Sequence, residues 1–161
     1  MRTIAQFSIT VAAVTLAACS PRPAEFSAED EANIRAMLEA RVAYIRVGDW
    51  VNWSLQHADS IIIQPANAPS IRGRAAILAW GQSIPPIDSL RLSSIQVWGE
   101  GNLAYATNVT RLKLRDQPPV AGKELMVFRR VRGGNWQVVA FSLSSDVPPS
   151  MAPAGILPRG R

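Results

Sequence analysis

The hydrophobic residues of this chain change their period partway along it, and that change limits what the chain can fold into. Over residues 28–83 most apolar residues recur every three or four positions, as on one face of a helix. From residue 90 onward they follow the pattern of β-branched, half-buried strands. The sequence therefore predicts an α+β domain in which a bent sheet wraps around helices.

Three helices are expected in the first half. Ser27 is followed within four positions by three acidic residues, which is typical of a helix N-terminus, and Gly48 ends the apolar stripe that follows. Asp49 can cap a short second helix. Residues 74–83 form a third helix that stops before two prolines. A short buried strand at 61–63 lies between the second and third helices.

Four strands are expected in the second half, arranged as an antiparallel meander. Glycine-rich segments at 99–102 and 133–135 supply the positive φ angles of hairpin turns. Around Ser93 and Ser94 the apolar phase switches, which indicates a bulge that bends the first of these strands. The four predicted strands are 90–98, 103–114, 120–132 and 136–143.

The N-terminal segment predicts export. Residues 1–18 have a cationic start, an apolar run and small residues before Cys19, which is the build of a secretory signal. The run is shorter than the ~20 apolar residues of a membrane-spanning helix. Its end, Leu16-Ala17-Ala18-Cys19, resembles the lipobox of bacterial lipoproteins, in which the cysteine is acylated. In that family, Ser20 implies transfer to the outer membrane, facing the periplasm.

These observations divide the chain into four parts. A signal peptide (1–18) precedes a lipidated tether (19–27), and one domain follows over 28–146. Residues 147–161 contain several prolines with little periodicity, so we expect a disordered tail that continues neither a helix nor a sheet.

The net charge of the chain is +5, from 17 basic and 12 acidic residues. We expect this charge to face anionic lipid headgroups rather than nucleic acid, because the arginines are scattered and the cell envelope holds little nucleic acid. Arg111, Lys113 and Arg115 alternate along one strand as a basic stripe, which is either a solvated outer face or a headgroup contact. No cofactor or metal is expected, because one histidine and an acylated cysteine cannot supply a metal site.

Several short motifs occur in a characteristic order over residues 29–145. Gly48-Asp49 follows the first predicted helix, and Ala58-Asp59 precedes the first strand. Gly73-Arg74-Ala75-Ala76-Ile77 opens the third helix, and Gly122-Lys123 lies in a closing strand. Together these motifs resemble the NTF2-like superfamily, in its SnoaL-like / DUF4440 branch.

The resemblance implies a cone-shaped domain, with three N-terminal helices packed on a curved antiparallel sheet around a pocket. It also implies a homodimer that packs through the sheet. The superfamily includes isomerases, hydrolases, cyclases and binding proteins, so the function must be argued from the site itself.

Two positions argue against isomerase chemistry. Enzymes of the ketosteroid-isomerase type in this superfamily carry a catalytic Asp before a proline at the end of the first strand, where this chain has Gln64 before Pro65. Their tyrosine donor on the first helix corresponds to Arg41. Because glutamine cannot accept a proton as a general base, we expect a binding protein rather than such an isomerase.

Arg41 lies in the middle of the apolar stripe of the first helix, and its side chain has three alternative placements. It points into the cone as an anchor for an anion, extends along the wall to water, or forms a salt bridge with Asp59 or Glu124. Tyr44, one turn later, either adds a hydroxyl to the pocket or packs in the core with its tip in water.

His57 and Asp59 are the candidate acid–base pair, because strand alternation would place both on one face. The alternative is a loop histidine that caps a turn. The tryptophans are mainly packing residues, of which one or two line a pocket for an apolar ligand. The predicted ligand-binding residues are Arg41, Tyr44, Trp53, Gln64 and Trp80.

Three functions therefore stay open. The first is a membrane-anchored module that binds a small, mainly apolar molecule, with or without a negative charge. The second is an acid–base enzyme that uses His57, Asp59, Tyr44 and Arg41. The third is an interaction protein with a filled core. A hollow with convergent polar groups favours the first two, and a solid hydrophobic interior favours the third.

Overall fold

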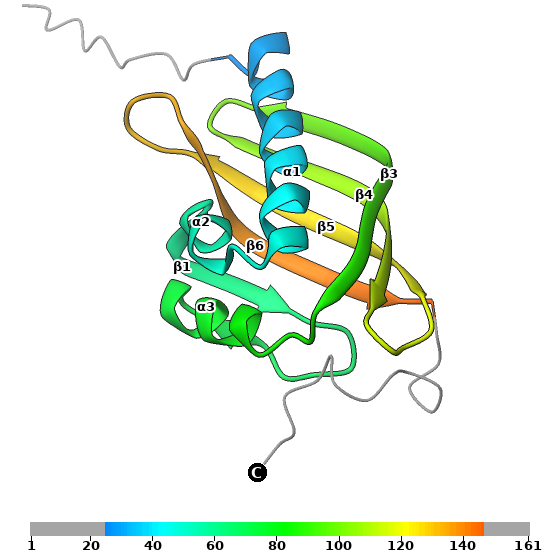
Figure 1. The fold of residues 1–161 in the computed structure, drawn as a ribbon. Coiled ribbons are helices and arrows are strands. Elements are labelled where there is room, and N and C mark those ends of the chain that lie inside the picture. Colours follow the sequence, from blue (N-terminus) through cyan, green and yellow to red (C-terminus); the bar gives the residue numbers. More distant parts are fainter. Residues whose placement is uncertain (1–24, 147–161) are drawn as a thin grey trace, which may run out of the picture.

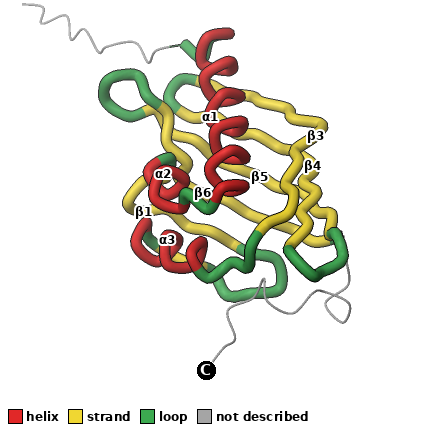
Figure 2. Tube along the Cα trace, in the orientation of Figure 1, coloured by secondary structure: helices red, strands yellow, loops and turns green. Residues whose placement is uncertain are grey.

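A curved six-stranded sheet packs against helix α1 (Ala28–Val47) in the computed structural model, which describes residues 25–146 (Figure 1). The shorter helices α2 (Trp50–Leu55) and α3 (Arg74–Gln82) lie together beside β1 (Figure 2). The predicted signal peptide, Cys19 and the tail fall outside the described residues. The strands are β1 (His57–Gln64), β2 (Ile71–Arg72), β3 (Ile87–Glu100), β4 (Leu103–Leu114), β5 (Val120–Arg130) and β6 (Trp136–Ser145).

The strand order is β2-β1-β6-β5-β4-β3, and the predicted meander from β3 to β6 is antiparallel throughout. The expectation of a wholly antiparallel sheet is wrong at one place, because β1 pairs with β6 in parallel. The helices do not all precede the sheet, as the family resemblance implied, since α3 follows β1 and β2. This order agrees with the strand that the residue pattern placed at 61–63 between the second and third helices. The parallel pairing depends on where β1 meets the far end of the chain, which local sequence patterns do not report.

The predicted bend in β3 is confirmed. Ser94 has a φ of 53°, and the pairing of β3 with β4 shifts register between Ser93 and Gln96. The extra residue changes which side chains point inward, so Leu92 before the bulge and Ile95 after it both pack against the core. The sheet can therefore curve while it keeps one apolar face.

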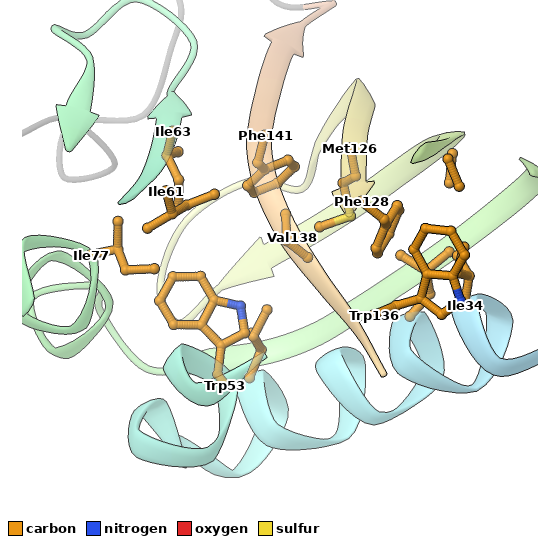
Figure 3. Packing of buried hydrophobic residues seen from close by; sticks show 14 of the residues in the cluster. Ile34, Trp53, Ile61, Ile63, Ile77, Met126, Phe128, Trp136, Val138 and Phe141 are labelled. Carbon is orange, nitrogen blue, oxygen red and sulfur yellow. The ribbon is translucent and has the colours of Figure 1, made fainter. Parts of the chain in front are cut away.

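Helix α1 begins and ends as the sequence predicts. Ser27 caps its N-terminus and forms a capping box with Asp30, and Gly48 ends it with a φ of 71°. Its buried face carries Ile34, Leu38 and Ile45. All three belong to the hydrophobic core, and Figure 3 shows Ile34 between the helix and the sheet. Within residues 25–146, no helix has the length and apolar character needed to span a bilayer.

The glycines of the two predicted turns have different roles. Gly101 and Gly133 have positive φ, as a hairpin turn requires. Gly99 instead lies within β3, beneath the ring of Phe26, and a Cβ atom there would collide with that ring. Its role is therefore to let Phe26, which lies two residues before α1, pack on the sheet.

Candidate functional site

An apolar cavity of about 130 Å³ lies between the helices and the inner face of the sheet. This volume is comparable to the ~150 Å³ of an engineered protein cavity that binds benzene. Residues 65–67 after β1 and residues 143–145 of β6 form part of its border. The aromatic lining residues are Trp50, Trp53, Trp80 and Phe141.

A buried ion pair forms the main polar part of the cavity wall. Arg41 Nη1 donates to Glu124 Oε2 at 3.0 Å, and Arg41 Nη2 donates to Glu124 Oε1 at 3.1 Å. Both side chains are almost fully buried, and the guanidinium lies 4.8 Å from the ring centroid of Phe141. Of the three placements predicted for the Arg41 side chain, the structure shows the salt bridge with Glu124.

The two partners meet because each lies on the inward face of its own element. Arg41 belongs to the buried stripe of α1, between Leu38 and Ile45. Glu124 alternates with the inward-facing residues Gly122 and Met126 of β5. Because the two charges neutralise each other, the pair adds no net charge to the cavity.

Two polar residues on the inner face of β4 lie beside this pair, and the sequence analysis missed both. Thr110 lines the cavity, and Asn108 lies directly opposite Glu124 in the ladder of β4 with β5. Neither the Thr110 hydroxyl nor the Asn108 amide has a hydrogen-bond partner among residues 25–146. The signal was present in the sequence, because Asn108 and Thr110 continue the inward phase of Ala104 and Ala106.

His57 is fully buried and supports α2 rather than the cavity. Its Nδ1 lies 2.9 Å from the carbonyl oxygen of Trp53, and its ring contacts the Trp53 ring at 4.9 Å. Burial, together with the positive charge of Arg41, lowers the pKa of His57 to about 4. The ring is therefore neutral at pH 7, and its Nδ1–H donates to the last turn of α2, as the alternative of a turn-capping histidine predicts.

Asp59 does not join His57, so the expectation that both lie on one face is wrong. Its side chain is 91% exposed and pairs with Arg74 at 3.0 Å. The pairing of β1 with β6 shifts register between His57 and Ile62, and strict alternation fails over this part of the strand. The structure therefore does not assemble the predicted acid–base pair.

The other predicted ligand-binding residues divide into two groups. Trp53 and Trp80 line the cavity beside Arg41. Gln64 is exposed, whereas Tyr44 borders a separate surface depression near α2. Within residues 25–146, no three histidine, cysteine or acidic side chains lie together as a metal site requires.

The basic stripe lies on the exposed side of β4 and the turn after it. Lys113 and Arg115 both pair with Asp88, at 3.2 and 3.6 Å. Arg111 is exposed and lies opposite Arg91 of β3 in the ladder.

Comparison with solved structures identifies the fold. An NTF2-like protein of unknown function from Pseudomonas putida KT2440 superimposes with a TM-score of 0.68 and 24% identity, over 78% of this chain and 94% of the other. A Mycobacterium tuberculosis protein of unknown function superimposes with a TM-score of 0.69 and 14% identity, over 81% of this chain and 89% of the other. A ketosteroid isomerase-like protein from Erwinia carotovora atroseptica superimposes with a TM-score of 0.65 and 18% identity, over 76% of this chain and 100% of the other.

This likeness shows that the chain has the NTF2-like fold. No protein-family model matches the sequence, and a search of curated proteins finds no match. The SnoaL-like / DUF4440 branch stays a prediction.

Proposed function

We propose that this NTF2-like domain binds a small, mainly apolar molecule in its cavity and catalyses no acid–base reaction there. The observation that carries the proposal is the hollow between the helices and the sheet, which is walled by aromatic side chains and one internally neutralised ion pair. A solid core, as the interaction-protein hypothesis requires, would leave no such space. Sites of this composition are typical of small-molecule binding.

The proposed absence of acid–base catalysis rests on what surrounds the only histidine. His57 has a pKa of about 4 and is not among the residues that line the cavity. A general base works best when its pKa lies near the working pH and its free nitrogen reaches the substrate. Asp59, the other member of the predicted pair, points to solvent.

We further propose that the domain is presented at the periplasmic face of the outer membrane through a lipid on Cys19. Support comes from the sequence of residues 1–20 alone. Cys19→Ser should abolish fatty-acid labelling and release the protein from membranes. If the variant keeps its signal segment and stays bound, that segment is an uncleaved anchor instead.

A homodimer through the outer face of the sheet is part of the same proposal. Trp98, Tyr105 and Val127 form a row across β3, β4 and β5, and the Trp98 and Tyr105 rings stack at 4.9 Å. Leu125 beside this row is 44% exposed. An apolar centre of this kind with a polar rim is the anatomy of a protein interface.

The dimer is tested by Tyr105→Glu, which should halve the mass measured by sedimentation. Val51→Glu on the exposed side of α2 serves as the control, because Val51 lies away from the sheet face. A wild-type protein that sediments as a monomer at every concentration would exclude this interface.

The binding proposal is tested by filling the cavity. Leu112→Trp places a larger ring among the lining residues, whereas Leu103→Trp makes the same change on an exposed position of β4. Toluene should bind the wild type and Leu103→Trp, as measured by calorimetry, and should bind Leu112→Trp at least ten-fold more weakly. Native mass spectrometry of protein from its own envelope should show a retained small molecule. Equal toluene binding by both variants would place the ligand elsewhere.

A further inference from the structure

Four polar groups around the cavity are buried and lack a hydrogen-bond partner among the described residues. They are the hydroxyl of Thr110, the indole N–H of Trp53, the Nε–H of Arg41 and the side-chain amide of Asn108. Thr110, Trp53 and Arg41 line the cavity, and Asn108 lies opposite Glu124 in the neighbouring strand. Buried polar groups are nearly always paired, so unpaired groups at one cavity call for an explanation.

We propose that the bound molecule is uncharged and carries a hydroxyl or carbonyl oxygen on a compact body about the size of one ring. The inference rests on the proposed binding function and specifies its ligand class. Thr110 and Trp53 supply the hydrogen bonds, and the aromatic wall holds the apolar body.

The charge of the site argues against an ionic ligand. Arg41 offers a positive charge, but the Glu124 carboxylate, to which both of its Nη atoms donate, already balances that charge. The Nε–H of Arg41 has no partner among the described residues, and it can donate to a neutral oxygen. An anion would approach the buried Glu124 carboxylate, and a cation would approach the buried Arg41 guanidinium. A charged ligand would also lose its hydration without gaining a net opposite charge, which is costly in an apolar site.

The hydrogen-bonding groups argue against a pure hydrocarbon. The indole N–H of Trp53 can only donate, whereas the Thr110 hydroxyl can donate or accept. An oxygen atom on the ligand could therefore accept from one group and, as a hydroxyl, donate to the other. A site with buried polar groups favours a molecule that pairs with them, because the analogue without the oxygen leaves them unpaired.

Four ring compounds of matched size separate these classes in calorimetric titrations of the full chain at pH 7. They are benzyl alcohol, toluene, benzoate and benzylamine. Benzyl alcohol should bind at least as tightly as toluene, although its hydroxyl must leave water, and at least ten-fold more tightly than either charged compound. Tighter binding of toluene or benzoate would overturn the inference while leaving a binding function intact. Failure of all four compounds to bind would overturn the proposed function itself.

Thr110→Val tests the proposed contact, because valine keeps the shape of threonine and lacks the hydroxyl. This variant should lower the affinity for benzyl alcohol about 3- to 10-fold and leave the affinity for toluene unchanged or higher. Thr107→Val is the matched control, since Thr107 lies on the other face of the same strand, outside the cavity lining. Thr110→Ser keeps the hydroxyl and should keep the preference for the alcohol. A Thr110→Val variant that folds and keeps the wild-type preference for benzyl alcohol contradicts the proposed contact.

Discussion

Helix α1 and strand β5 are joined by two ion pairs of opposite orientation, one partly and one almost fully buried, and the surroundings of the two pairs differ. Near the start of α1, Asp30 accepts from both Nη atoms of Arg130, each at 2.7 Å. Eleven residues further along the helix, Arg41 donates to Glu124. Reversing the helix on the sheet would bring like charges together, so the two pairs also select its direction.

The first pair is embedded in a hydrogen-bonded cluster. The Asp30 carboxylate also accepts from the indole N–H of Trp136 at 3.0 Å and from the backbone N–H of Ser27 at 2.9 Å. Burial raises the pKa of Asp30, but these donors, led by Arg130, hold its pKa well below the ordinary 3.8. This end of the domain fixes the chain as it enters α1.

The second pair lies at the cavity. Among the side-chain hydrogen bonds of the described residues, the Glu124 carboxylate accepts only those from Arg41, and the side chains of Thr110 and Asn108 nearby make none. Both arginines have an Nε–H without a partner among the described residues, so the ion pairs themselves do not distinguish the two ends of α1. The proposed binding site differs in the space beside its pair and in the unpaired side chains of Thr110 and Trp53 that line this space.

The largest expected effect is that of breaking the pair at the cavity. Arg41→Met leaves the Glu124 carboxylate buried without a partner, so the free energy of unfolding in urea should fall by about 3 to 5 kcal/mol. The double variant Arg41→Met, Glu124→Leu should recover most of this loss, because it replaces both charges with apolar groups. A single variant as stable as the wild type would mean that Arg41 is available to anchor an anion.

A smaller loss is expected at the other pair. Asp30→Asn keeps the shape of the side chain but removes the negative charge to which Arg130 and Trp136 donate. The free energy of unfolding in urea should therefore fall by about 2 to 3 kcal/mol. Toluene affinity should not change, because Asp30 lies about 16 Å along the helix from Arg41. A change in ligand affinity would show that the two ends of α1 are coupled.

The smallest of the three effects comes from pH. The pKa of His57 is about 4 in the folded protein against 6.5 in the unfolded chain, so the unfolded chain binds the extra proton between these values. Stability that is present at pH 7 is therefore lost as the pH falls, by about 2 kcal/mol at pH 5.

The matched variant for this effect is His57→Gln. The free energy of unfolding in urea is measured for both proteins at pH 7 and pH 5. Between these pH values the wild type should lose about 2 kcal/mol more than the variant, because the variant has no histidine to protonate. The Asp30 carboxylate contributes little in this window, because it stays ionised well below pH 5. Parallel pH profiles of the two proteins would show that His57 is protonated as readily in the folded protein as in the unfolded chain.

The sequence by itself determined the local features of this protein. Caps, breakers and apolar periods act over a few residues, so the bounds of α1, the bulge at Ser94 and the meander from β3 to β6 could all be predicted. The salt bridge of Arg41 with Glu124 was one of several alternatives, because the stripe of α1 placed Arg41 inward without specifying its partner.

Only the tertiary structure decided what depends on distant segments. The parallel pairing of β1 with β6 joins residues about eighty positions apart, and its register shift separates His57 from Asp59. The cavity, too, is a space left between helices and sheet, and Thr110 and Asn108 matter only because of what lies opposite them. Local patterns report which face of an element is buried, and packing decides whether the buried space is filled.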